Sequence, residues 1–199
     1  MAGRSNLKRA WTELGGKSAN IVRADCPDLD AAVESAIVSI YFNQGESCNA
    51  PSRLFVEASI KDAFLDKALA LVPRHAPGDP LIEATLMGAI VDTTQMKTVL
   101  GYIEDGKREG ARLLAGGAAA RQDSGGLYVE PTLFDGVEPG MRIAREEIFG
   151  PVLPVLSFTD NDDITVPFGG YKQSGNGSDK SLHAFDKYTE LKTTWIQVG

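Results

Sequence analysis

A single cysteine, Cys48, stands among small polar residues in the stretch YFNQGESCNA, residues 41–50. A thiol attacks as its thiolate, so a nucleophilic cysteine needs access to a substrate and surroundings that favour the anion. Gly45 ends the preceding apolar pattern and lets the chain turn, and Asn49 is small enough to leave room for a substrate. No lysine or arginine lies within four residues, and Glu46 would disfavour a thiolate nearby. From these residues alone, Cys48 is either a nucleophile or a small residue filling the end of a buried helix.

A second group that can do chemistry lies in TELGGKSANIV, residues 12–22, where Glu13 precedes a glycine pair and a strand-like run. A carboxylate held against a turn serves as a general base when burial raises its pKa toward neutrality. The alternative is a surface glutamate before a tight turn. Spacing does not decide between the two.

The third candidate is REEIFGPV, residues 145–152. Its two carboxylates, aromatic ring and Gly-Pro turn can bind a polar ligand and stack on a ring. The alternative is a charged loop whose Phe149 packs into the core. A glycine-rich stretch, residues 169–177, has the outer spacing of a phosphate-binding loop but lacks its Lys-Ser/Thr pair, so turn-forming glycines explain it better.

The composition of the chain limits the classes of protein to which it can belong. Hydrophobic residues make up 43% and charged residues 24% of 199 residues, as in ordinary globular proteins. The net charge of -7 disfavours a nucleic-acid partner, and no run approaches the ~20 apolar residues of a membrane span. Without a secretory signal, we expect a cytoplasmic location and two free thiols, Cys26 and Cys48. His75 and His183 are far apart and no CxxC pair exists, so we expect no metal site.

Strand-like and helix-like segments alternate along the chain, which predicts an α/β fold with a mostly parallel sheet flanked by helices. Asp28 is a predicted N-cap of one helix, and Ser59 with Asp62 has the spacing of a capping box on the next. Internal prolines suggest that the two extended segments after residue 126 lie at sheet edges or bends. We expect strands at 18–24, 52–58, 111–117, 127–137 and 150–158, and helices after residues 28 and 59 and over 93–109.

Together these motifs resemble the aldehyde dehydrogenase superfamily, over nearly the whole chain. Their order is ELGGKS at Glu13, FNQGESC ending at Cys48, EEIFGPV at Glu147, PFGGYKQSG from Pro167, and the closing YTELKT. KQSGNG and the C-terminal segment look most like the branch that acts on γ-glutamyl-γ-aminobutyraldehyde and related aminoaldehydes.

The resemblance implies oxidation of an aldehyde to a carboxylic acid with NAD or NADP as cofactor. Cys48 would attack the aldehyde to form a thiohemiacetal and then a thioester, and Glu13 would activate the water that releases the acid. It implies that Glu147 holds the nicotinamide ribose and that Phe149 lies near the nicotinamide ring.

The resemblance also divides the chain. Residues 1–160 correspond to the family's catalytic domain, without the N-terminal cofactor domain. Residues 161–199 correspond to a glycine-rich loop and a C-terminal oligomerisation segment, whose strand implies a homo-oligomer.

The departures from the family pattern leave three hypotheses. Family members are more than twice as long, and their N-terminal part holds most of the dinucleotide-binding domain and the asparagine that completes the oxyanion hole. A second gap lies between Asp160 and Ile164. Loss of one oxyanion donor costs on the order of 10²–10³ in rate. The chain is therefore a truncated aldehyde dehydrogenase, an inactive homologue that folds and self-associates, or a residual thiol esterase.

Overall fold

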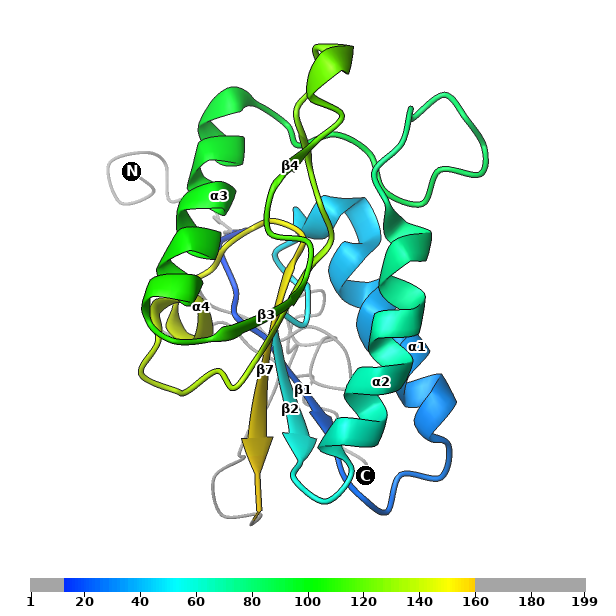
Figure 1. Ribbon diagram of the computed structural model, residues 1–199, viewed down its shortest axis with the longest axis vertical. Coiled ribbons are helices and arrows are strands. Elements are labelled where there is room, and N and C mark those ends of the chain that lie inside the picture. The colour runs from blue at the N-terminus through cyan, green and yellow to red at the C-terminus, as the bar shows by residue number, and fades with distance from the viewer. Residues whose placement is uncertain (1–12, 160–199) are drawn as a thin grey trace, which may run out of the picture. The chain divides into compact units, whose positions relative to one another are not determined.

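A computed structural model describes residues 13–159 of the chain; residues 1–12 and 160–199 lie outside the described part (Figure 1). Residues 16–159 belong to one compact unit, and residues 13–15 fall outside it, so the two parts are treated separately. The predicted C-terminal strand and the glycine-rich loop lie outside the described residues. None of the described helices is long and apolar enough to cross a membrane.

The compact unit is built on a five-stranded sheet in the order β1-β2-β7-β6-β3. β1, β2, β7 and β6 run parallel, and β3 pairs antiparallel with β6 at one edge. The strands are β1 (Ala19–Val22), β2 (Arg53–Glu57), β3 (Arg112–Ala115), β6 (Thr132–Asp135) and β7 (Val152–Phe158). A separate antiparallel pair joins β4 (Ala119–Ala120) and β5 (Tyr128–Val129). The predicted α/β fold with a mostly parallel sheet is confirmed.

Helices cover both faces of this sheet (Figure 1). On one side lie α1 (Leu29–Tyr41) and α2 (Lys61–Leu71), followed by the short 3₁₀ turns η2 (Phe42–Gly45) and η3 (Val72–His75). On the other side lie α3 (Thr93–Arg108) and α4 (Arg142–Arg145), while η4 (Gln122–Ser124) belongs to the β4–β5 connection. The sheet is therefore the middle of three layers.

Alternation along the strands divides the core in two, because successive side chains of a strand point to opposite faces. In β7, Leu153 and Val155 join the cluster under α1 and α2, whereas Val152 and Leu156 join the cluster under α3 and α4. All but one residue of β7 is buried, as expected for a central strand covered on both faces.

The position of Pro154 corrects one sequence-based expectation. Proline cannot donate a ladder hydrogen bond, which is why a sheet edge or a bend was expected, yet β7 is a central strand. The strand tolerates it because β6 pairs with the first half of β7, through Pro154, and β2 pairs with the second half, from Val155. The proline stands where one partner strand gives way to the other.

One of the two predicted helix caps is confirmed and the other is wrong. Asp28 caps α1 as predicted, accepting a hydrogen bond from the Ala31 N–H at 3.0 Å. The capping box predicted at Ser59 is not formed: Ser59 donates to the Glu57 carboxylate at 2.9 Å, and α2 begins after Ile60 without a side-chain cap. Because the Ser59 hydroxyl is hydrogen-bonded to the nearby Glu57 carboxylate, it does not cap the first turn of α2.

A buried carboxylate ties α2 to the antiparallel edge of the sheet. Asp135 is 3% exposed and accepts from Lys61 at 3.0 Å and from Arg112, its partner across the β3–β6 pair, at 2.5 Å. Burial alone would raise the pKa of Asp135, but the hydrogen bonds from Lys61 and Arg112 outweigh it and hold the pKa below its usual value.

Replacing Asp135 is expected to destabilise the protein. Asp135→Asn removes the charge that compensates Lys61 and Arg112 and should lower the free energy of unfolding by roughly 2–3 kcal/mol at pH 7, as for the loss of a hydrogen bond to a charged group. Because the folded pKa is depressed, this stabilisation is present above the usual aspartate pKa and is lost as the pH falls through the folded value. Urea unfolding at pH 7 and in acid measures both effects.

The matched control is Asp66→Asn, since Asp66 is exposed and makes no ion pair within residues 13–159. Equal unfolding midpoints for the two variants at pH 7 would contradict the assigned role of Asp135.

Candidate active site

The candidate residues of the compact unit gather at the amino ends of three parallel strands. Residues 16–18 lead into β1, residues 46–52 lead into β2, and residues 146–151 lead into β7. In Figure 1 these three strands point the same way, so the segments that enter them lie at one end of the sheet. Because parallel strands align their starts, segments far apart in sequence meet at this edge.

Cys48 is exposed, so the alternative of a cysteine buried at a helix end is wrong. The chain reaches it through a left-handed turn at the end of α1: Asn43 has φ 48°, Gln44 has φ 56° and Gly45 has φ 72°. A residue other than glycine pays about 1 kcal/mol or more for this conformation. Such strain persists only where surrounding contacts hold it.

Side chains within the turn supply those contacts. Asn43 donates to the Glu46 carbonyl at 2.8 Å, and Gln44 accepts from the Gly88 N–H at 3.3 Å. Glu46 accepts from the Val91 N–H at 3.1 Å and from the Gln44 amide at 3.3 Å. The side chains of Gln44 and Glu46 thus each accept one hydrogen bond from the loop that precedes α3, and the second oxygen of Glu46 accepts from Gln44 within the turn.

Gly16 joins the Cys48 segment to the Glu147 segment. Its N–H donates to the Glu147 carboxylate at 3.0 Å, and a Cβ placed on Gly16 would lie 2.3 Å from the Cys48 carbonyl oxygen. No residue with a side chain fits such a close approach. The second glycine of the ELGGK motif is therefore the point at which all three predicted motifs meet, a role that the sequence pattern did not reveal.

A second glycine contact connects the same two segments. A Cβ on Gly45 would lie 2.2 Å from the Gly150 carbonyl oxygen, and a Cβ on Gly150 would lie 2.4 Å from Val99 of α3. The turn before Cys48 and the turn after Phe149 are thereby packed backbone against backbone, and the side chain of Val99 on α3 packs against the backbone of Gly150.

The two adjacent glutamates of the REEIFGPV motif have different partners. Glu146 accepts from the Tyr102 hydroxyl and from Arg142, each at 2.9 Å, and these bonds lower its pKa. Arg142 in turn binds Asp105 at 2.6 Å. Glu147 is half-buried and accepts only through Oε1 from Gly16 within the described residues, which leaves its second oxygen for a ligand.

Phe149 is 37% exposed and has φ 53°, so the alternative that packs its ring into the core is wrong. The carbonyls on either side of its Cα accept from the side-chain amide of Gln95, at 3.0 Å from Ile148 and 2.7 Å from Phe149. No sequence signal singles out Gln95.

Glu13 is exposed and lies in the part of the chain outside the compact unit. Its meeting with Cys48 stays a prediction. Likewise, the catalytic roles of Cys48 and Glu13 and the cofactor roles of Glu147 and Phe149 stay predictions.

Lys17 is a buried charge that sequence reasoning missed. Its Nζ is inaccessible and has no hydrogen-bond partner within residues 13–159, while Arg53 donates two hydrogen bonds to the Lys17 carbonyl, at 2.6 and 3.0 Å. Burial and the nearby Arg53 charge lower the pKa of Lys17 to about 7, against the opposing influence of Glu147 and Glu146. The lysine is thus poised between its charged and neutral forms beside Glu147.

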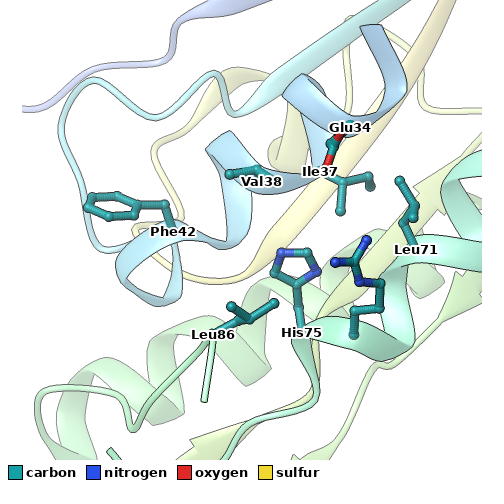
Figure 2. Close-up of a pocket in the computed structure, with 8 residues that line it drawn as sticks. Glu34, Ile37, Val38, Phe42, Leu71, His75 and Leu86 are labelled. Atoms are coloured by element: carbon teal, nitrogen blue, oxygen red, sulfur yellow. The ribbon is translucent and has the colours of Figure 1, made fainter. Parts of the chain in front are cut away.

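A separate apolar pocket of about 260 Å³ lies between α1 and η3 (Figure 2). Its walls include Ile37 and Val38 of α1, with His75 of η3 pointing toward that helix. Cys48, Glu147 and Phe149 do not line it; Phe42, at the start of the left-handed turn, is its one link to the Cys48 segment. Within the described residues, no cluster of histidine, cysteine or carboxylate side chains is arranged as a metal site.

The sequence profile of the aldehyde dehydrogenase family matches residues 1–166. The chain belongs to the aldehyde dehydrogenase family. Among curated relatives, the NADP/NAD-dependent aldehyde dehydrogenase PuuC of Escherichia coli K12 is 41% identical over 242 aligned positions, covering 99% of this chain and 48% of the relative. The mitochondrial aldehyde dehydrogenase of Homo sapiens is 39% identical, with 99% and 46% covered.

Solved structures agree with this assignment to the aldehyde dehydrogenases. The indole-3-acetaldehyde dehydrogenase AldA of P. syringae, a C302A mutant in complex with NAD+ and IAA, is 52% identical with a TM-score of 0.83, covering 99% of this chain and 49% of that one. A γ-glutamyl-γ-aminobutyraldehyde dehydrogenase of Burkholderia cenocepacia is 48% identical with a TM-score of 0.84, covering 97% and 48%.

This aldehyde dehydrogenase chain spans about half the length of the curated relatives it matches. The alignment with PuuC extends over 242 positions although the chain has 199 residues, so that relative contains internal residues without a counterpart here.

The buried lysine gives a pH-dependent prediction. Between its folded pKa near 7 and its ordinary value near 10.5, the unfolded chain holds a proton that the folded chain does not, so the contribution of Lys17 makes the protein more stable as the pH rises. Lys17→Met should therefore raise the free energy of unfolding at pH 6 by up to about 5 kcal/mol and flatten its rise from pH 7 to 10. Urea unfolding across this pH range measures both.

Lys97→Met on the exposed face of α3 is the control and should leave the slope unchanged. Parallel pH profiles for wild type and Lys17→Met would show that Lys17 is not desolvated in solution.

Proposed function

We propose that this chain carries the acyl-transfer centre of an NAD(P)-dependent aldehyde dehydrogenase, which oxidises an aldehyde to its carboxylic acid with Cys48 as nucleophile. The observation that carries the proposal is the convergence at Gly16. One glycine contacts the segment of an exposed thiol and donates to a carboxylate whose second oxygen has no partner within residues 13–159.

The residues present fit a nicotinamide dinucleotide at this edge. Glu147 offers an oxygen without a partner in the described residues, and a carboxylate accepts hydrogen bonds from ribose hydroxyls. Phe149 presents a partly exposed ring from a fixed backbone conformation, suited to a planar ring system. Glu147 and Phe149 would therefore hold the cofactor, which supplies the hydride acceptor that turns the first adduct into a thioester.

Each remaining step falls to a residue of the chain. The Cys48 thiolate adds to the aldehyde carbon, forming a C–S bond as the carbonyl π pair moves to oxygen. The Cys48 backbone N–H makes no hydrogen bond within residues 13–159 and is free to donate to that oxyanion. Glu13 takes a proton from water that attacks the thioester, and the C–S bond breaks to release the acid and the thiolate.

The substrate class follows from the relatives in part. One matching structure is named for γ-glutamyl-γ-aminobutyraldehyde and another for indole-3-acetaldehyde. We propose an aminoaldehyde, on the KQSGNG segment and that likeness. A cytoplasmic homo-oligomer assembled through residues 161–199 is part of the same proposal.

Cys48 chemistry is tested on the 199-residue chain by two assays. Aldehyde-dependent NADH formation, with an aminoaldehyde and indole-3-acetaldehyde as substrates, reports the whole reaction. Release of nitrophenol from nitrophenyl acetate reports acyl transfer without a cofactor. Cys48→Ala should abolish both, with losses of at least about 10³-fold, since no other thiol shares this segment.

Cys26→Ala is the matched control, because Cys26 is a half-buried free thiol outside the site, and it should retain both activities. Ester hydrolysis without NADH formation would make the chain a thiol esterase. Neither activity in folded wild-type protein would make it an inactive homologue and reject the proposed function.

A further inference from the structure

We propose that Gln95 is a positioning residue that holds the turn of residues 147–150 in its cofactor-facing conformation, by donating both amide hydrogens to two successive backbone carbonyls. The proposal rests on the proposed function for its cofactor. The part that concerns the conformation of residues 147–150 depends only on contacts within this chain.

Two successive carbonyls reach one amide group only because Phe149 is left-handed. In an extended chain successive carbonyls point to opposite sides, whereas a residue with helical torsions turns both to the same side. With φ 53° at Phe149, the Ile148 and Phe149 oxygens both face Gln95, at 3.0 and 2.7 Å. The amide and the strained torsion therefore depend on one another.

Gln95 is itself fixed at the start of a long helix. It is the third residue of α3, and its backbone N–H donates to the N-cap Asp92 at 2.7 Å. The sequence Asp-Thr-Thr-Gln has capping-box spacing, in which the third side chain reaches back to the cap. Here that side chain reaches instead to residues 53 and 54 positions away.

The requirement for an amide separates this role from helix capping. A glutamate at this helix position is favoured by the helix dipole and suits a capping box at least as well as glutamine. A carboxylate, however, has no hydrogen to donate and would repel both carbonyls. Gln95→Glu therefore preserves the helix start and removes the hold on the turn.

Loosening the turn affects the cofactor side of the site more than the thiol side. Glu147 and Phe149 flank Ile148 and lose their fixed directions when Phe149 returns to an extended torsion. The turn before Cys48 keeps its own contacts, through Asn43, Gln44 and Glu46. Hydrogen exchange in residues 146–152 and alkylation of Cys48 therefore report on the two segments separately.

The test compares wild type, Gln95→Glu, Gln95→Met and the control Gln122→Glu on the exposed η4 turn. Hydrogen exchange of the peptide covering residues 146–152 should quicken by about tenfold or more in both Gln95 variants, since two hydrogen bonds of the turn are lost. Exchange in the centre of α3 and the rate of Cys48 alkylation by iodoacetamide should match wild type and Gln122→Glu.

The cofactor readout is the KM or Kd for NAD+, which should rise about tenfold in Gln95→Glu with kcat changed less than twofold where turnover is measurable. Unchanged exchange in residues 146–152 would overturn the proposal. So would equal quickening throughout α3, which would give Gln95 a general structural role. Quickened exchange in a protein that shows no NAD+ binding would retain the positioning role and reject the cofactor part of the proposed function.

Discussion

Backbone-to-backbone contact at glycine is the constraint on which this site depends. Gly16 touches the Cys48 carbonyl, and Gly45 touches Gly150, at separations that exclude any side chain. These contacts bring together segments that are separated by about a hundred residues in sequence and that carry the thiol and the carboxylate. Hydrophobic packing positions the strands and helices. It does not by itself bring the backbones of two loops into van der Waals contact.

The charged groups around this junction divide their roles by the partners they have. Glu146 is committed to Tyr102 and Arg142, and through them to Asp105 on α3. Among the described residues, one oxygen of its neighbour Glu147 has no partner, and the Glu147 charge acts on the buried amine of Lys17 by raising its pKa against the effect of burial. Adjacent residues of one motif thus differ: Glu146 is an anchor between the motif and α3, and Glu147 is the group proposed to bind the cofactor. The sequence motif alone does not distinguish the two glutamates.

The sequence predicted the elements well because their signals are local. Apolar spacing located α1 and α3, Asp28 marked a helix start, and alternation of strands with helices indicated the parallel sheet. Two sequence-based expectations were wrong because neighbouring groups changed the hydrogen bonding at Ser59 and at Pro154. Glu57 captured Ser59, and the split pairing of β7 removed the penalty on Pro154. The contacts of Gly16, Lys17 and Gln95 join positions 30 to 130 residues apart and leave no periodic trace. The motif resemblance singled out Cys48 and Glu147, whose roles stay predictions, but the contacts of Gly16 that connect their two segments required coordinates.

The site lies where the chain enters the parallel strands, although open α/β sheets usually bind ligands where strands end. The loops that leave β1, β2 and β6 therefore lie away from the candidate site. They can lengthen, shorten or take on contacts with other molecules while every group around Cys48 keeps its place. A fold built this way can vary in sequence and length at one edge of its sheet while the other edge stays unchanged.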